Sequence, residues 1–336
     1  MKPAVNALFL SFTLFLSLIS TASYAAEDAW LLLQKSAYAA RELNYQGVFV
    51  YQNGKQTSSV QITHMNNAGQ EMTRNVVLDN SAHTNTQSNQ PREVFSQGSD
   101  IVIMRQQNQK MVIEKRRGQN LFPAMLPTDL RAIKFSYNAQ LGAKEYIAGR
   151  EAQIIDLVPN DAFRYGYKIW ADTEYGLLLK MTLVDNKNQT LEQIAFNQLS
   201  TLNSQDVNWF QPKIDVKKNY VMEDKTAVNH VDSDWIVAEL PAGYVKVDHR
   251  ALAVPGKTAP VDQMIFSDGI GSVSLFIEPL IKGVRPKMGH MSIGSTNICA
   301  RVLDGYQITV VGEVPSLPCL QIAKAVSFRK QAALNK

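Results

Sequence analysis

Several residue patterns that carry enzyme chemistry are absent from this sequence. It has no Gly-x-Ser-x-Gly segment, which would present a nucleophilic serine on a sharp turn. It has no His-Glu-x-x-His or Cys-x-x-Cys segment for a metal ion, and its five histidines are scattered along the chain. We therefore predict a protein that is not an enzyme, with no catalytic residues, no metal and no cofactor. A hydrolase whose residues meet only in the folded chain is the weakest alternative.

Neither sign of charge dominates, since 34 basic and 30 acidic side chains leave a formal net charge of +4. So small an excess does not indicate a nucleic-acid partner. Long apolar runs are also missing, except Ala7–Ile19, which follows Lys2 and precedes Ser23-Tyr24-Ala25. This order predicts a signal peptide over residues 1–25, cut after Ala25 or, as second choice, after Ala26. An uncleaved anchor is the alternative. No later run approaches the ~20 apolar residues that span a bilayer, so we expect a soluble, exported protein.

Cysteine is scarce, and the two cysteines are Cys299 and Cys319. An even number of cysteines in an oxidising compartment favours a disulfide. Closing a loop of about 20 residues would stabilise the fold by on the order of 3 kcal/mol in the chain-entropy model. We therefore predict a disulfide between Cys299 and Cys319. Two buried free thiols are the alternative.

The chain is long enough for two domains once the signal peptide is removed. We expect a first domain over residues 26–205, a linker over residues 206–234 and a second domain over residues 235–330. The linker is predicted because this stretch is polar and charged and holds no long apolar run. Within it, the segment DVNWFQP is the part that could still pack on the first domain.

The first domain changes its apolar period from about 3.6 to 2 after its first segment. Glu27–Leu43 is predicted to be a helix, with Leu33 and Ala37 on its apolar face. Alternating segments then predict strands, beginning with a hairpin that turns at Asn53-Gly54. A short helix is expected at Thr128-Asp129. Because few helices intervene, the sheet should be largely antiparallel.

The second domain is predicted to be a small α+β unit. Its strands are expected in the segments QMIFSDG, SVSLFIEP, HMSIGSTNICARVLDG and YQITVVGEVP. A helix over residues 318–328 should follow, opened by Pro318. For the whole chain, the fold class is therefore α+β with mostly antiparallel β structure.

The stretch SDGIGSVSLFIEP, Ser267–Pro279, allows three interpretations: a phosphate-binding glycine loop, part of a hydrolase, or a turn that leads into a strand. A phosphate loop needs a helix after it, but strand alternation follows here and ends at a proline. We therefore predict a turn whose Ser and Asp have no catalytic partner. Val273, Leu275 and Ile277 should face the core. Phe276 and Glu278 point the other way and are candidate partner-binding residues; cover by the last helix is the alternative for Phe276.

Two further features indicate ligand binding. The segment FRYGYKIW places Tyr165, Tyr167 and Ile169 on one side of a strand. A curved sheet lined in this way can enclose an apolar ligand, and a filled core is the alternative. In EKRRGQN, the cations Lys115, Arg116 and Arg117 stand beside the apolar LFPAML, a combination that suits a phosphorylated lipid. A solvated turn is the alternative there.

Long segments of both domains resemble a known family. GREAQIIDLVPNDAFRYGYKIWADTEYGLLLKMTLVDNKNQTLEQIAF resembles the first domain of the RseB/MucB family, and MIFSDGIGSVSLFIEP followed by ITVVGEVP resembles its second domain. The resemblance covers essentially the whole chain after the signal peptide. It implies a larger domain like the lipoprotein carriers LolA and LolB, which is a half-open β-barrel whose helices plug an apolar concavity.

The resemblance also implies a function. Members of this family are periplasmic proteins that bind the periplasmic domain of the anti-sigma factor RseA, shield it from site-1 proteolysis and keep sigma-E inactive. Off-pathway lipopolysaccharide or lipoprotein is expected to bind the first domain and release RseA, and the family's members self-associate. On this basis the second domain is the expected RseA-binding domain. A periplasmic lipid or lipoprotein carrier of the LolA type is the alternative function.

Overall fold

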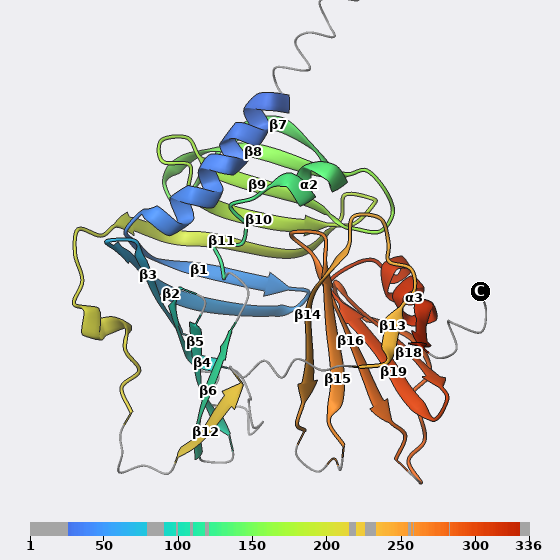
Figure 1. Cartoon of the computed structure of the whole chain (residues 1–336). Coiled ribbons are helices and arrows are strands. Elements are labelled where there is room, and N and C mark those ends of the chain that lie inside the picture. The colour runs from blue at the N-terminus through green and yellow to red at the C-terminus, as the bar shows by residue number, and fades with distance from the viewer. Residues whose placement is uncertain are drawn as a thin grey trace, which may run out of the picture.

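The chain forms two domains in the computed structural model (Figure 1). The structure describes residues 26–78, 91–98, 100–107, 110–117, 121–214, 220–225, 233–254, 257, 259–281 and 283–329. The predicted signal peptide lies outside these residues. None of the helices in the described ranges is long and apolar enough to cross a membrane.

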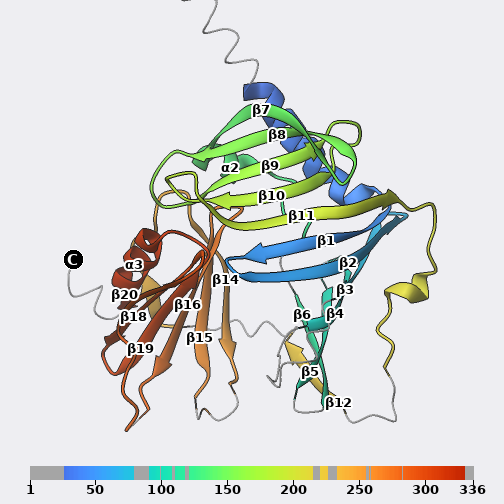
Figure 2. The same cartoon turned by 180° about the vertical axis from the view of Figure 1, so that it is seen from behind.

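The first domain is built on one strongly curved sheet, which twelve strands form among the described residues (Figures 1 and 2). Its strands are β1 (Tyr45–Asn53), β2 (Gln56–Asn67), β3 (Gln70–Val77), β4 (Pro91–Gln97), β5 (Asp100–Gln107), β6 (Lys110–Arg117), β7 (Tyr137–Ile147), β8 (Arg150–Pro159), β9 (Gly166–Asp172), β10 (Leu178–Val184), β11 (Thr190–Thr201) and β12 (Tyr220–Lys225).

The strand order in this sheet is β12-β6-β5-β4-β3-β2-β1-β11-β10-β9-β8-β7. All neighbours are antiparallel apart from β12, which runs parallel to β6. The two end strands, β12 and β7, do not pair with each other, so the barrel is half open. The hairpin predicted at Asn53-Gly54 is present, since Asn53 of β1 pairs with Gln56 of β2.

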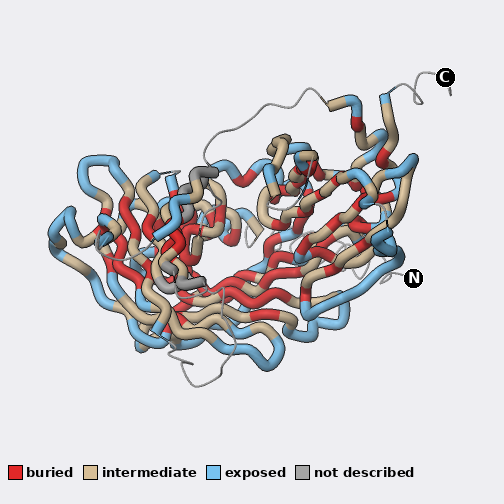
Figure 3. The backbone as a smooth tube through the Cα atoms, turned by 90° about the horizontal axis from the view of Figure 1, so that it is seen from below, coloured by how far each residue is buried: buried red, intermediate tan, exposed pale blue. Residues whose placement is uncertain are grey.

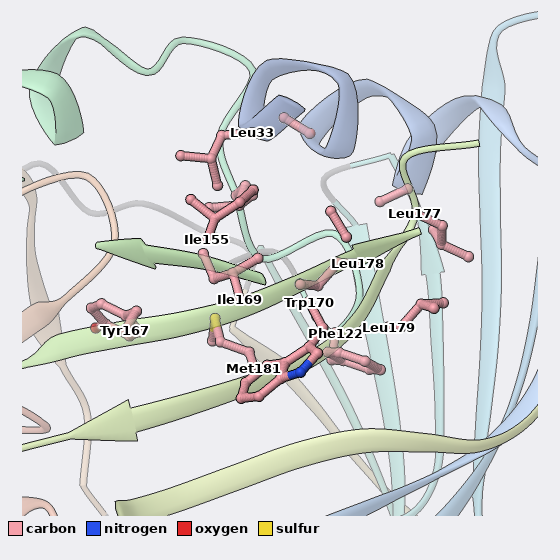
Figure 4. Close-up of a cluster of buried hydrophobic side chains, with 14 of the residues drawn as sticks. Leu33, Phe122, Ile155, Tyr167, Ile169, Trp170, Leu177, Leu178, Leu179 and Met181 are labelled. Carbon is pink, nitrogen blue, oxygen red and sulfur yellow. The ribbon is translucent and has the colours of Figure 1, made fainter. Parts of the chain in front are cut away.

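Helices plug the concave side of this sheet, as predicted. The N-terminal helix, residues 26–42, buries an apolar face made by small and branched side chains, among them Leu33 and Ala37. Leu33 packs towards Ile155 and Ile169 of the sheet (Figure 4). The short helix α2 (Arg131–Ser136) adds Ile133 to the same core. Burial of this apolar surface holds the helices against the sheet.

Strand β10 and the residue before it are buried on both faces, which is unusual for an antiparallel sheet. Leu177, Leu178 and Leu179 are consecutive, so their side chains point to alternate sides, and all three are buried. The segment GLLLKMTLV places apolar residues at successive positions, so both faces of the strand carry apolar side chains. Figure 3 shows that buried positions follow the strands of both domains, whereas the turns are exposed.

The segment predicted as a linker carries two elements that attach to the first sheet. In the 3-10 helix η1 (Val207–Phe210), Phe210 packs on Met65 and Met72, which confirms that DVNWFQP lies on the first domain. Strand β12 then extends the sheet beside β6. The exact domain boundaries stay a prediction.

The second domain has a six-stranded antiparallel sheet in the order β14-β15-β16-β19-β18-β17. Helix α3 covers one of its faces, and a two-stranded ribbon of β13 and β20 closes the end of the core (Figure 1). The elements are β13 (Trp235–Val237), β14 (Val245–Leu252), β15 (Val261–Ser267), β16 (Ser272–Pro279), β17 (Gly289–Ile293), β18 (Thr296–Leu303), β19 (Tyr306–Gly312), α3 (Ser316–Ala325) and β20 (Val326–Phe328).

The last helix differs from its prediction at both ends. It begins at Ser316, so Pro318 lies inside its first turn, where the missing proline N–H breaks no helical hydrogen bond. It ends at Ala325, because the next residues form β20 and pair with β13. The predicted helix over residues 318–328 was therefore wrong in its last turn. Aromatic contacts of Trp235 with Phe328 explain the preference for a strand there.

Candidate binding site between the two domains

The turn SDGIG links β15 to β16 and contacts the first domain. Asp268 is fully buried, and its Oδ1 accepts hydrogen bonds from the backbone N–H of Gly271 at 2.8 Å and of Ile270 at 3.2 Å. Its Oδ2 accepts from Arg164 Nε of the first domain at 2.9 Å. The prediction of a turn was correct. The turn residues were predicted to have no catalytic partner; the partner of Asp268 is structural, and it lies 104 residues away in sequence.

Arg164 joins three parts of the chain at this interface. Besides Asp268, its guanidinium donates to Asp161 and to the backbone carbonyl of Ala242 at 2.6 Å. The rings of Tyr137 and Tyr244 lie 5.9 and 5.4 Å from its central carbon, within the range of cation–π attraction. Burial opposes the charge on Arg164, but the Asp268 carboxylate outweighs this and raises the pKa of the guanidinium.

Two glycines allow the domains to come this close. A Cβ at Gly243 would stand 2.6 Å from Ser136 Oγ and 2.9 Å from an Arg164 nitrogen, and the φ of Gly243 is +81°. A Cβ at Gly269 would stand 3.1 Å from Ala132 Cβ of helix α2. A side chain at Gly243 would push the domains apart, so glycine is required there by contact as well as by backbone conformation. At Gly269 a Cβ would need a shift of a few tenths of an ångström in Ala132, and the φ of +104° favours glycine.

A second contact between the domains is formed by buried polar groups. Tyr165 Oη donates to the carbonyl of Ser295 at 3.4 Å and accepts from Asn297 Nδ2 at 3.2 Å. Ser295 Oγ also donates to Glu192 of β11. Glu192 accepts a further hydrogen bond from Tyr51 Oη at 2.7 Å. Burial and this hydrogen bond raise the pKa of Tyr51.

A cavity of about 790 Å³ lies between the two contacts. The first domain lines it with apolar side chains from the concave sheet and the loop before α2, which include Met125, Tyr167, Met181, Leu183 and Ile194. The second domain adds the small polar side chains Ser267, Ser272, Ser274 and Thr296. The first domain also lines the cavity with Tyr51, Glu192 and Gln193, and the second domain with Ile270, Val311 and Glu313. A wall of mixed apolar and polar groups suits a ligand that has both apolar and polar parts.

The predicted lipid-binding residues are separated in the structure. Tyr167 lines the cavity, Ile169 is wholly buried in the first core (Figure 4), and Tyr165 belongs to the domain contact. The backbone of residues 115–117 lies at the end of β6, and seven strands separate β6 from β9 in the sheet. The side chains of Lys115, Arg116 and Arg117 lie outside the described residues.

The predicted partner-binding residues lie on the face of the second sheet opposite α3. Val273, Leu275 and Ile277 face the core beneath α3, as predicted. Phe276 alternates with them and is half-buried, so α3 does not cover it. Glu278 lies on the same face and forms an ion pair with Lys257. We call this the open face; its upper part, at Ser272 and Ser274, lines the cavity.

The two cysteines lie side by side in the second core. Both thiols are buried and free, and Cys319 Sγ donates a hydrogen bond to the backbone carbonyl of Asn297 at 3.6 Å. Burial, and then the neighbouring Cys299, raise the pKa of Cys319 to about 12. Their proximity is compatible with the predicted disulfide, which stays a prediction.

Family models match both parts of this architecture. The model of the MucB/RseB N-terminal domain matches residues 28–214, and the model of the MucB/RseB C-terminal domain matches residues 229–327. The chain belongs to the MucB/RseB family. The predicted resemblance is thereby confirmed. Like other members of the MucB/RseB family, the chain is a regulatory binding protein and not an enzyme.

Individual relatives of the MucB/RseB family match nearly the full length. The sigma factor AlgU regulatory protein MucB of Pseudomonas aeruginosa is 27% identical over 325 residues, which cover 95% of this chain and 96% of that protein. The sigma-E factor regulatory protein RseB of Escherichia coli is 24% identical over 317 residues, with 93% and 95% covered.

Solved structures of MucB share the fold. MucB in complex with MucA(peri) has a TM-score of 0.69 and 25% identity, and the match covers 89% of this chain and 98% of that one. The complex of Pseudomonas aeruginosa MucA and MucB has a TM-score of 0.69 and 26% identity, with 90% and 99% covered. Within the part of our chain that the structure describes, no group of three or more His, Cys, Asp or Glu side chains could hold a metal ion.

Proposed function

We propose that this protein binds the periplasmic segment of an anti-sigma factor and thereby keeps an envelope-stress sigma factor inactive. The match to MucB across both domains carries this proposal, because MucB has been solved in complex with the periplasmic part of MucA. The relatives' names, which describe regulators of sigma-E and AlgU, support it. Bound to the chain, the anti-sigma factor would be shielded from its site-1 protease in the periplasm.

The open face of the second sheet is the surface proposed for the anti-sigma factor. Phe276 offers a half-buried aromatic side chain on a central strand, and aromatic anchors contribute strongly to binding. Glu278, which pairs with Lys257, supplies a polar margin beside it. Both residues lie on β16, whose other end forms the wall of the cavity.

We propose that a lipid in the cavity controls this binding. The first domain supplies most of the large apolar side chains of the cavity wall and the second domain completes the wall, so an acyl chain inside it would contact both. A ligand can shift an equilibrium only if it binds the two states unequally. Because Ser274 lines the cavity and Phe276 follows on the same face of β16, an occupied cavity would alter the surface that the anti-sigma factor uses. By linkage, the anti-sigma factor would then weaken lipid binding by the same factor.

A lipid or lipoprotein carrier is the second candidate function, and the cavity is the observation that favours it. A carrier would move a lipoprotein between membranes without an anti-sigma factor. It would not need the second domain, which here holds half of the cavity wall.

A protection assay tests the proposed function. The periplasmic segment of the anti-sigma factor is incubated with its site-1 protease, with and without the purified chain. We expect the chain to slow cleavage and added lipopolysaccharide to restore it. Cleavage at an unchanged rate would reject the regulatory function. Protection that lipopolysaccharide leaves unchanged would reject the lipid switch alone. Self-association also stays a prediction, and the mass in solution tests it.

A further inference from the structure

The loop between β16 and β17 exposes three large apolar side chains. Ile281 is 56% exposed, Val284 59% and Met288 72%. They lie within eight residues of each other in sequence. Met291 on the neighbouring edge strand β17 is exposed as well. Scattered apolar side chains on a surface need no explanation, but a contiguous group marks an interaction site.

Specific hydrogen bonds hold this loop in place. The backbone N–H of Lys287 donates to Gln307 Oε1 at 2.9 Å, and Gln307 Nε2 donates back to the Lys287 carbonyl at 2.9 Å. Gln307 is itself buried. The N–H of Val284 closes a turn onto the carbonyl of Ile281 at 3.1 Å. These hydrogen bonds fix the backbone of the loop, and the apolar side chains point outwards from it.

The charged residues of the loop itself are basic. Arg285 and Lys287 are exposed between the apolar side chains, and no acidic residue occurs between positions 280 and 303. The nearest acidic residues along the chain are Glu278, which is paired with Lys257, and Asp304 in the adjoining turn. Exposed cations between apolar groups complement a lipid bilayer, whose anionic head groups cover an apolar interior.

The position of the loop leaves it free to touch such a surface. It follows the end of β16 opposite to the SDGIG turn, so it lies at the end of the sheet that is remote from the first domain (Figure 1). We propose that the side chains of Ile281, Val284, Arg285, Lys287 and Met288 form a docking site for an anionic phospholipid bilayer. This site is separate from the lipid cavity and from the open face, and it would orient the protein on a membrane.

A bilayer fits these observations better than a strand of another protein. A strand that adds to a sheet edge uses the backbone of β17 and the side chains of one face. It would leave the loop side chains Ile281 and Val284 exposed. A bilayer accommodates apolar side chains from a loop tip and places the Arg285 and Lys287 head groups at the lipid phosphates.

Vesicle co-sedimentation of the mature chain tests the proposal. We expect binding to vesicles that contain phosphatidylglycerol, weak binding to vesicles of phosphatidylcholine alone, and a loss of binding as salt is raised. Removing one cation near an anionic bilayer weakens binding about fivefold, so Arg285→Ser/Lys287→Ser should weaken it by a factor on the order of 25. Val284→Ser/Met288→Ser should also lose binding.

Two control variants distinguish binding through this loop from binding through any exposed apolar or cationic side chain. Tyr146→Ser removes an apolar side chain that is 74% exposed on β7, and Arg131→Ser removes an exposed cation of the first domain. Both should bind vesicles like the parent protein. Equal binding by the loop variants and these controls, or no preference for anionic vesicles, would overturn the proposal. So would self-association that the loop variants abolish, since a second copy would then cover the loop.

The test is also independent of the proposed regulation. Without vesicles, the loop variants should bind the anti-sigma segment like the parent protein and keep its melting temperature. A loss of that binding would assign the loop to the protein partner and reject the bilayer.

Discussion

Arg164 and Asp268 form a buried ion pair across the two domains, with 2.9 Å between Nε and Oδ2. Their side chains are 2% and 0% exposed. Removing one partner of a buried ion pair weakens the compensation of the charge that remains buried. The stability lost in this way exceeds the stability that the intact pair contributes relative to a pair of apolar residues. The pair therefore contributes to holding the two domains in position, together with the Arg164 hydrogen bond to Ala242 and the contact of Tyr165 with Ser295.

Asp268→Asn tests this contribution. Asparagine keeps an oxygen for the N–H groups of the turn but removes the charge that faces Arg164. We expect a loss of roughly 3 kcal/mol in the free energy of unfolding, measured by urea denaturation. Asp129→Asn is the control, because Asp129 pairs with Arg131 on the surface, and it should leave the midpoint unchanged. Equal midpoints for both variants would show that the buried pair does not hold the domains together.

Gly243→Ala tests the close approach of the domains. Its control is Gly305→Ala, because Gly305 has a similar φ of +79° but no atom within 4 Å of the added Cβ. The control should lose about 1 kcal/mol of stability from the left-handed backbone alone. Gly243→Ala should lose roughly 2 kcal/mol more, because its Cβ meets Ser136 and Arg164. Similar losses for the two variants would argue against a tight interface at Gly243.

Ser274→Trp tests whether the cavity is the lipid site. The indole would fill space between β16 and the side chains that the first domain contributes to the cavity wall. We expect binding of lipopolysaccharide, followed by displacement of a fluorescent acyl probe, to fall at least tenfold, a change of about 1.4 kcal/mol. Ser274→Ala leaves the cavity open and should bind like the parent protein. Unchanged lipid binding by Ser274→Trp would place the lipid elsewhere.

Phe276→Ala tests the open face. Phe276 lies opposite the core beneath α3, so its truncation should lower the melting temperature less than truncation of the core residue Leu275. Aromatic anchors at interfaces contribute about 2 kcal/mol or more, so affinity for the anti-sigma segment should fall by roughly thirtyfold. Tyr146→Ala, on β7 of the first domain, is the matched control. A large loss of stability in Phe276→Ala would instead assign this side chain to the core.

Thiol labelling tests the predicted disulfide. In the native protein neither cysteine should react at pH 8, because both are buried and burial raises the pKa of Cys319 to about 12. After unfolding without a reductant, a disulfide predicts no labelled thiol, and reduction should then expose two. Two thiols labelled before reduction would show that the cysteines are free.

Local patterns predicted most of the elements. The 3.6 period predicted the N-terminal helix, and the Asn53-Gly54 turn predicted the first hairpin. The alternation after the SDGIG turn placed Val273 and Leu275 in the core, which the structure confirms. These features depend on neighbouring residues, so one sequence is sufficient to find them.

The candidate site was only partly predictable, because it depends on contacts between distant residues. No local pattern distinguishes Asp268 from an ordinary turn residue, and its partner Arg164 lies 104 positions away. The parallel pairing of β12 with β6 was missed for the same reason, since its segment is short and charged. Tyr167 was found because an aromatic on a curved sheet suggests a cavity, but Ile169 on the same side proved to be core.

Isothermal titration of the mature chain with the periplasmic segment of the anti-sigma factor from the same organism tests the proposed function most directly. We expect saturable binding with micromolar affinity or tighter, and a marked loss of that affinity in Phe276→Ala but not in Tyr146→Ala. The absence of binding heat together with the absence of a co-eluting complex would contradict it.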